Sequence, residues 1–320
     1  MPQLSILIPV YNEEESLPEL QEWIYAVMEA SRLDFELIYI DDGSSDESWK
    51  VIQALSQKDC RVKAVRFIRN YGKSAALDVG FSKADGEVVV TMDADLQDSP
   101  EEIPELYRMI KEEGYDLISG WKRKRYDPLS KTLPSRFFNG VTRLLSGIPL
   151  HDFNCGLKAY SQRVVKNIHI YGEMHRYIPL IAKWNGFGKI GEKEVAHRPR
   201  KYGTTKFGLE RFIHGFLDLI SVSFVNRYRK NPMHFFGALG TLSFLSGFII
   251  TVWLIFEKIQ GLRNGVAVRE ITDQPLFFLA LVALIVGVQL FLTGFMAEMM
   301  TSNTSRKSDY NIAEEIKKDN

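Results

Sequence analysis

Two aspartates one residue apart are the residues of this chain whose type and spacing best suit a chemical task. Asp93 and Asp95 follow the apolar run Val88–Met92, which has the composition of a buried strand. In open α/β sheets, ligands bind beyond the carboxyl ends of the strands, and Mg²⁺ binds a few carboxylate oxygens together with phosphate oxygens of a substrate. The pattern therefore favours a divalent-cation site for a phosphorylated ligand, against the alternative of two solvated aspartates in a turn.

Further polar groups follow the two strands expected earlier in the chain. The first strand runs into Tyr11 and Glu13, and the second runs into Asp41 and Asp42. Asp41 or Asp42 could accept hydrogen bonds from a base or a ribose, and a tyrosine ring could pack on a nucleobase. Each residue alone is more often part of a turn or a helix cap. Three strand ends that carry such groups together favour a nucleotide site.

The elements that must position these residues alternate along the first 200 residues. Strands are expected at 4–10, 35–40, 62–67, 88–92 and 117–119, and helices at 14–30, 45–56, 74–84 and 100–113. The last helix begins with Ser99, Pro100 and two glutamates, which are typical of a helix N-terminus. This alternation predicts an α/β domain with a mostly parallel sheet.

The composition narrows the classes of partner. The chain has 320 residues, with 40 Lys and Arg against 40 Asp and Glu. This balance argues against nucleic-acid binding, and any anionic partner would have to bind to a local cluster of basic residues. Cys60 and Cys155 offer neither a disulfide framework nor a metal-ligand spacing, and fit a reducing compartment. The N-terminus leads into a strand without a signal sequence, so we expect the catalytic part in the cytosol.

Two C-terminal segments are long and apolar enough to cross a bilayer. Residues 234–256 and 274–297 contain no Asp, Glu, Lys or Arg, and a spanning helix needs about 20 apolar residues. The alternative is a pair of buried helices in a soluble domain. An even number of spans places both chain ends on one side, and a nucleotide-dependent domain requires that side to be cytosolic. We therefore expect an integral inner or plasma membrane protein with a cytoplasmic catalytic domain.

A third apolar pattern precedes the first span. Apolar residues recur at spacings of three and four from Leu209 to Phe224, which predicts an amphipathic helix on the membrane surface or packed on the soluble domain. Small residues around Gly240 and Gly287 would allow close packing of helices, so a homo-oligomer is possible. The expected organisation is a catalytic domain at 1–205, a juxtamembrane helix region at 206–232, a two-helix transmembrane domain at 233–300 and a polar cytoplasmic tail at 301–320.

Four motifs give the chain a specific resemblance. They are PVYNE at 9–13, DDGSSD at 41–46, GKSAAL at 72–77 and DADLQD at 93–98. Over roughly residues 3–226 the chain resembles the family-2 glycosyltransferases of the Rossmann-like GT-A fold, and among them the polyprenyl-phosphate hexose synthases, such as dolichyl-phosphate mannose synthases and bacterial polyprenyl-phosphate glucosyltransferases. The resemblance implies that Pro9, Tyr11, Glu13 and Asp42 contact the nucleoside, and the expected donor site also includes Asp41 and Lys73. The resemblance also implies a Mg²⁺ or Mn²⁺ site of Asp93, Asp95 and Gln97.

Basic residues after the fifth expected strand form a candidate acceptor site. Cationic and hydroxyl groups there suit a lipid phosphate near a bilayer, although a solvated basic loop is the alternative. By resemblance, Lys131 and Ser135 hold the acceptor phosphate together with either Lys122 or Arg123. Asp152, in a segment that resembles DxxxGxxAY, is either close to the acceptor or a structural cap. The predicted acceptor site thus comprises Lys122, Arg123, Lys131, Ser135, Arg136 and Asp152.

The segment 200–206 resembles a mobile loop that closes over the donor diphosphate, so Arg200 and Lys206 would neutralise the leaving group. No Ser–His or Cys–His nucleophile pattern is found, and none is needed, because a phosphate monoester with a second pKa of about 6 is largely dianionic at neutral pH. The pair His175–Arg176 is left without a role.

The resulting prediction is inverting, metal-dependent transfer of a hexose from a UDP- or GDP-sugar to undecaprenyl or dolichyl phosphate at the cytoplasmic membrane face. The predicted catalytic residues are Asp93, Asp95, Arg200 and Lys206. One alternative is a polysaccharide synthase with a sugar-hydroxyl acceptor, but the QxxRW element of such enzymes is absent. Another is a non-catalytic nucleotide-sugar-binding membrane protein, against which the intact acidic and basic residues count.

Overall fold

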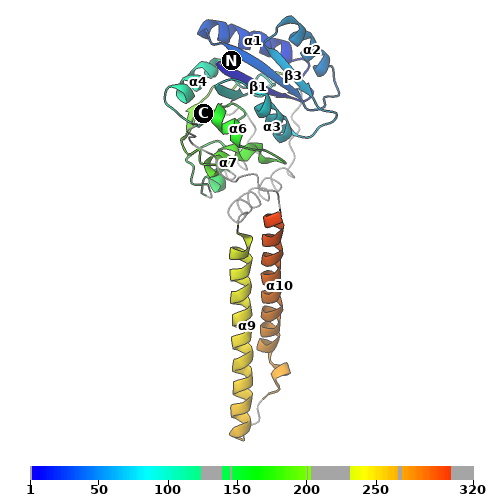
Figure 1. Cartoon of the computed structure of the whole chain (residues 1–320), viewed down its shortest axis with the longest axis vertical. Coiled ribbons are helices and arrows are strands. Elements are labelled where there is room, and N and C mark those ends of the chain that lie inside the picture. Colours follow the sequence, from blue (N-terminus) through cyan, green and yellow to red (C-terminus); the bar gives the residue numbers. More distant parts are fainter. Residues whose placement is uncertain are drawn as a thin grey trace, which may run out of the picture. The chain divides into compact units, whose positions relative to one another are not determined.

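The structure is a computed structural model that describes residues 2–123, 139–144, 146–199, 201–202, 231–265 and 269–303 (Figure 1). The described residues form two compact units that divide near residue 222. The first unit contains a sheet covered by helices, and the second contains two long helices.

The first unit is built on a seven-stranded sheet in the order β3-β2-β1-β4-β6-β5-β7. Its strands are β1 Leu4–Val10, β2 Phe35–Asp41, β3 Val62–Arg66, β4 Val88–Thr91, β5 Leu117–Trp121, β6 Lys158–Ser161 and β7 Ile190–Glu194. All neighbours pair in parallel except β6, which is antiparallel to both β4 and β5. The carboxyl ends of β1, β2 and β4 therefore lie at one edge of the sheet, where ligands of such folds bind.

Helices cover the sheet and supply the rest of the core. They are α1 Leu17–Ser31, α2 Ser48–Lys58, α3 Lys73–Lys83, α4 Ile103–Lys111, α6 Gln162–Asn167 and α7 Ile178–Trp184, with 3-10 turns η1 Pro100–Glu102 and η2 Met174–Tyr177. Every side chain of β2 and β4 is buried, as expected of central strands covered on both faces. In α1, the buried Leu17, Leu20, Ile24 and Met28 recur at helical spacing and form its inner face.

The expected α/β architecture with a mostly parallel sheet is confirmed, with small differences at the element ends. The expected helix at 100–113 is a 3-10 turn followed by α4. Ser99 precedes Pro100 at the N-cap position, but its side chain makes no capping hydrogen bond. The strands β6 and β7 and the short elements α6, α7 and η2 extend the domain beyond the predicted elements.

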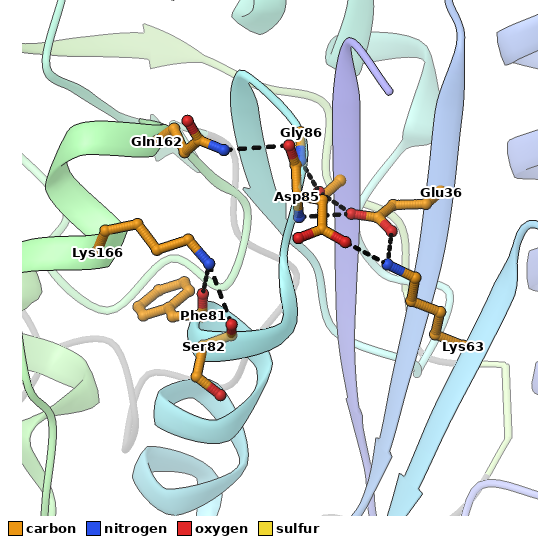
Figure 2. Close-up of polar contacts among 9 residues, drawn as sticks. Glu36, Lys63, Phe81, Ser82, Asp85, Gly86, Gln162 and Lys166 are labelled. Carbon is orange, nitrogen blue, oxygen red and sulfur yellow. Dashed lines mark hydrogen bonds and ion pairs between the residues drawn. The ribbon is translucent and has the colours of Figure 1, made fainter. Parts of the chain in front are cut away.

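A polar network joins the amino ends of β1, β2 and β3 to the turn before β4 (Figure 2). Asp93 follows the opposite, carboxyl end of β4. The buried carboxylate of Glu36 accepts hydrogen bonds from Ser5 Oγ (2.5 Å) and from the backbone N–H of Asp85 (2.8 Å). Lys63 Nζ lies 2.5 Å from Glu36 and 2.6 Å from Asp85. Lys166 of α6 donates to backbone carbonyls at the end of α3. The network therefore holds the α3–β4 turn against three strands and α6, far from the predicted site.

The second unit consists of α9 Pro232–Arg263 and α10 Pro275–Asn303, with the 3-10 turn η3 Ile271–Asp273 before α10. The expected span 234–256 falls within α9, and the expected span 274–297 falls within α10 except for its first residue. Both helices are long and apolar enough to cross a membrane. Most of their side chains are exposed in the described structure, unlike those of the core helices that were the alternative. Leu209–Phe224 and the tail beyond residue 303 lie outside the described residues, so the expected domain boundaries stay predictions.

Small residues bring α9 and α10 into close contact. A Cβ added to Gly240 would lie 2.8 Å from the carbonyl oxygen of Gly287, and one added to Gly287 would lie 2.6 Å from the backbone nitrogen of Phe244. Ser243 Oγ donates a hydrogen bond to the carbonyl oxygen of Ala283 (2.9 Å). The backbones therefore approach through glycine, as in many packed membrane helices.

Candidate active site

The loops after β1 and β2 are hydrogen-bonded to each other. Asn12 has a left-handed backbone (φ 57°), which asparagine tolerates better than most residues. Its backbone N–H donates to Ser44 Oγ (3.0 Å), and its side-chain Oδ1 accepts from the backbone N–H of Ser45 (2.8 Å). This pairing fixes the backbone on both sides of Asn12, and it leaves the Tyr11 side chain 40% exposed beside Glu13 at the edge of the sheet.

The carboxylates of Asp41 and Asp42 are both engaged by the protein. Asp41 is fully buried, accepts from the backbone N–H of Ser44 (2.9 Å) and lies 3.2 Å from Arg66 Nε. Asp42 accepts from the backbone N–H groups of Tyr71 (2.7 Å) and Gly72 (2.9 Å). Burial raises the pKa of Asp42, although these two N–H groups oppose the rise. Asp42 therefore fixes the backbone just before α3.

Lys73, the first residue of α3, forms an ion pair with Asp93 Oδ1, and each side chain is about one-third exposed. Burial alone raises the pKa of Asp93, but the positive charges of Lys73, Lys122 and Lys158 outweigh it and lower that pKa to about 2. Asp93 is therefore a carboxylate at neutral pH. The GKSAAL and DADLQD motifs thus meet at one point.

Asp95 is the second carboxylate beyond β4. It is 8% exposed, and its Oδ1 accepts from the backbone N–H of Gln97 (3.2 Å) across a turn in which Leu96 is left-handed (φ 61°). Gln97 is half-buried beside it. No group of three or more His, Cys, Asp and Glu side chains that could hold a metal occurs among the described residues. Two carboxylates fit a hard cation such as Mg²⁺ or Mn²⁺, which completes its oxygen shell with water and substrate phosphate.

The turn before β6 packs directly against Asp93. A Cβ added to Gly156 would lie 2.4 Å from Asp93 Oδ2, and Thr91 Oγ1 donates to the carbonyl oxygen of Gly156 (2.9 Å). Asp152 is buried in the preceding turn, where its Oδ1 accepts from the backbone N–H of Asn154 (3.0 Å). The segment that resembles DxxxGxxAY therefore supplies a glycine contact to Asp93. The Asp152 contact is of the kind expected of a structural cap.

The two basic residues after β5 that are candidates for the acceptor site differ in their surroundings. Lys122 is nearly buried, and its Nζ lies 2.6 Å from the fully buried Asp98. Burial disfavours the charged form of Lys122, but Asp98 outweighs this and raises the pKa of Lys122. Arg123 is mostly exposed, and its Nη1 lies 3.4 Å from Glu194 Oε2. Of the two, Arg123 has the more accessible charge for an external phosphate.

Five predicted site residues cannot be placed. Lys131, Ser135, Arg136, Arg200 and Lys206 lie outside the described residues. The described residues bring Lys73, Asp93 and Asp95 together with the strand-end loops that carry Tyr11 and Glu13. Pro9 lies within β1, half-buried.

The sequence motifs did not connect His175 with Lys73. His175, in η2, lies against Ser74 of α3: its backbone N–H donates to Ser74 Oγ (3.0 Å), and its Nδ1 lies 3.0 Å from the same oxygen. Lys73, Lys158, His175 and Arg176 line a cavity of about 20 Å³ beside Gly156. Adjacent basic residues were the only sequence signal for this pair, and nothing in its spacing relates it to a residue 101 positions earlier.

Comparison with known proteins gives consistent results. Residues 5–169 match the family model described as Glycosyl transferase family 2. The chain is 35% identical over 301 residues to the dodecaprenyl-phosphate galacturonate synthase of Rhizobium johnstonii, covering 93% of this chain and 87% of that protein. It is also 35% identical over 300 residues to the undecaprenyl-phosphate 4-deoxy-4-formamido-L-arabinose transferase of Pseudomonas paraeruginosa, covering 93% and 84%.

A solved structure shows the same fold. The glucosyl-3-phosphoglycerate synthase of Mycobacterium tuberculosis, crystallised with Mn²⁺ and UDP-glucose, superposes with a TM-score of 0.55 at 20% identity, covering 70% of this chain and 79% of that chain. At this identity the similarity concerns the fold alone.

Proposed function

Because the chain belongs to glycosyl transferase family 2, we propose that it transfers a hexose from a nucleotide sugar to a polyprenyl phosphate at a membrane. The observation that carries this proposal is the similarity to two relatives named for dodecaprenyl and undecaprenyl phosphate. The similarity covers 93% of the chain and so cannot be confined to the catalytic domain. It extends into the two apolar helices, which would keep the enzyme beside its lipid acceptor.

On the donor side, the uracil or guanine nucleoside of a UDP- or GDP-sugar would bind at the ends of β1 and β2, which carry Pro9, Tyr11, Glu13, Asp41 and Asp42. Lys73 would add positive charge next to the donor. When bound, Mg²⁺ or Mn²⁺ would neutralise negative charge on the departing diphosphate. Asp93 and Asp95 would hold the metal with their carboxylates, and Gln97 would lie beside it.

On the acceptor side, Arg123 offers an exposed guanidinium, which binds phosphate with paired hydrogen bonds. Lys131, Ser135 and Arg136 would complete the acceptor site, with Lys122 and Asp152 supporting it from the interior. The phosphate is itself the nucleophile, so the protein has to orient it rather than deprotonate it. Attack from the face opposite the departing diphosphate inverts the anomeric centre. Arg200 and Lys206 would neutralise the leaving group.

The proposed location follows from the same chemistry. Nucleotide sugars and the proposed cytoplasmic domain would share one compartment, while α9 and α10 anchor the chain in the inner or plasma membrane. The lipid phosphate would then reach the catalytic domain from the cytoplasmic leaflet.

A transfer assay tests the proposal directly. Full-length protein in membranes is incubated with radiolabelled UDP- and GDP-sugars, undecaprenyl phosphate and Mg²⁺ or Mn²⁺. We expect one donor to give an organic-extractable, mild-acid-labile product that depends on added lipid phosphate. Release of free sugar into water, or transfer to a water-soluble acceptor with no lipid product from any donor, would contradict it.

A further inference from the structure

The small cavity beside Asp93 is lined by an unusual concentration of positive charge. Lys73 reaches it from α3, Lys158 from β6, and His175 and Arg176 from η2. None of the described side chains that line the cavity is acidic. Two described carboxylates contact the lining residues from outside the cavity: Asp93 pairs with Lys73, and Glu173 Oε2 lies 3.9 Å from His175 Nδ1. The cavity therefore adjoins the predicted metal site but has the opposite charge.

Burial makes the charge of Lys158 costly. Lys158 is 4% exposed, and its Nζ donates to the carbonyl oxygen of Cys155. Burial lowers the pKa of Lys158; Cys155, Asp152 and Asp93 offset part of this effect, and the charge of Lys73 adds to it. Burial and the charges of Lys73, Arg176 and Lys158 likewise lower the pKa of His175. A bound anion would offset the repulsion among the positive charges of Lys73, Lys158 and Arg176, of which Lys158 is the buried one.

His175, which lies among these positive charges, also offers a hydrogen-bond donor. Ser74 Oγ accepts the backbone N–H of His175 and lies 3.0 Å from Nδ1 of its ring, and we assign the Ser74 hydroxyl as the donor to Nδ1 of the neutral ring. This assignment leaves the Nε2–H as the donor of the ring. With the guanidinium of Arg176, the cavity then combines neutral and charged donors, a set that suits the two oxygens of a carboxylate.

The volume limits what the cavity can hold. About 20 Å³ is room for roughly one water molecule or one small polar group. A hexose ring must therefore lie outside, toward Asp93, with only one substituent in the cavity. Gly156 separates the two places, since it lines the cavity and packs against Asp93.

We propose that the donor of this enzyme is a nucleotide-linked hexuronic acid, whose carboxylate enters this cavity and is bound by Arg176 and His175 with Lys158. This inference rests on the proposed function, because it places the sugar of the donor beside Asp93. Arg176 and His175 then determine specificity: they select the substituent at C6 and orient the ring for attack at C1.

Donor binding provides the test. The full-length protein in detergent with Mn²⁺ is titrated calorimetrically with two pairs of ligands that differ only at C6: UDP-galacturonate against UDP-galactose, and GDP-mannuronate against GDP-mannose. We expect the hexuronate of one pair to bind about 10-fold or more tightly than its neutral partner. Equal or tighter binding of both neutral sugars by the wild-type protein would overturn the inference, and this comparison needs no variant.

Variants separate a sugar carboxylate from the other anion of the donor, its diphosphate. Arg176→Gln should remove most of the hexuronate preference while changing the affinity for UDP or GDP alone by less than about 3-fold, and Arg176→Lys should retain part of it. Arg163→Gln, at an exposed position of α6, serves as the matched control and should leave all affinities unchanged. If Arg176→Gln weakens the nucleotide alone as much as the hexuronate donor, the cavity binds diphosphate and the inference is wrong.

The transfer assay distinguishes failure of this inference from failure of the proposed function. Lipid-linked product from neutral hexoses only would overturn the hexuronate inference and leave the proposed function standing. A binding preference for the hexuronate without lipid-linked product from any donor would support the inference and contradict the proposed acceptor.

Discussion

The ammonium group of Lys73 is ion-paired with Oδ1 of Asp93, the first carboxylate of the DADLQD motif. Asp42 fixes the start of the helix that carries this lysine, through hydrogen bonds from the backbone N–H groups of Tyr71 and Gly72. The ends of β2 and β4 are thus linked through the start of α3. A cation that enters the site must share Asp93 with Lys73 or displace it.

Removing the lysine should make the carboxylates more available to a metal. We expect Lys73→Met to raise the affinity of the donor-free protein for Mn²⁺ by about 10-fold, because the variant removes a competing positive charge next to Asp93. Electron paramagnetic resonance of free Mn²⁺ measures this affinity. Lys83→Met, at the exposed end of α3, is the matched control. Unchanged or weaker Mn²⁺ binding in Lys73→Met would show that the pair does not compete with the metal.

The α/β pattern and the strand-end part of the candidate site could be predicted from the sequence because both depend on local signals. Apolar runs and helix starts mark β1 to β5 and α1 to α4, and parallel pairing brings their ends together. The predicted strand at 4–10 agrees with β1 Leu4–Val10. The positions of Asp93 and Tyr11 follow from such strand ends.

The other side of the site depends on long-range pairing that no local signal reports. β6 has four residues and pairs antiparallel between β4 and β5, so its place in the sheet could not be inferred from its own sequence. This strand carries Lys158 and follows the turn that brings Gly156 to Asp93. The contact of His175 with Ser74 likewise links residues 101 positions apart. Tertiary packing alone created this cavity.

The second carboxylate provides the direct test of metal dependence. Asp95→Asn keeps the size of the side chain but removes its charge, so we expect transfer to fall by roughly 10²-fold or more. Chelation of divalent cations should abolish wild-type transfer, and added Mg²⁺ or Mn²⁺ should restore it. Membrane insertion, measured by fractionation, should be unaffected. If Asp95→Asn turned over as fast as the wild type at any metal concentration, the metal assignment would be wrong.

Gly156 has no room for a side chain. The Cβ of Gly156→Ala would lie 2.4 Å from Oδ2 and 2.6 Å from Cγ of Asp93, so the carboxylate or the turn before β6 must move. A shift of about 1 Å in a catalytic group can lower a rate by about 10²-fold, and we expect a loss of this size in the transfer assay. Gly188→Ala, where a Cβ meets no atom within 4 Å, should retain activity. Equal activities of the two variants would argue against the contact.

A surface ion pair should make the stability of the first unit depend on pH. Asp59 accepts from Arg61 Nη2 (2.6 Å) and Nε (3.0 Å). These hydrogen bonds outweigh partial burial and lower the pKa of Asp59 to about 2. Because the pKa is lower in the folded than in the unfolded state, the stabilisation is complete above about pH 4 and is lost as the pH falls toward about 2.

The corresponding variant is Asp59→Asn. We expect it to be less stable than the wild type by about 1–2 kcal/mol near neutral pH, with the difference shrinking between about pH 4 and pH 2. Denaturant unfolding of the full-length protein in detergent, followed across this range, measures both values. Asp34→Asn, at an exposed aspartate before β2, is the control. A difference that stays constant across the range would exclude the ionised pair as its cause.

Gly287 tests the close packing of α9 on α10. A Cβ at this position would lie 2.6 Å from the backbone nitrogen and 2.9 Å from the Cα of Phe244, so Gly287→Leu must separate the helices. Overpacking of this kind costs about 1–3 kcal/mol, and we expect earlier thermal unfolding of the helix pair in detergent. Val288→Leu changes the adjacent, exposed position and should leave the transition unchanged. Because lipid tails are as apolar as leucine, the difference between the variants reports backbone packing rather than hydrophobicity. Coincident transitions would mean that the helices do not depend on this contact.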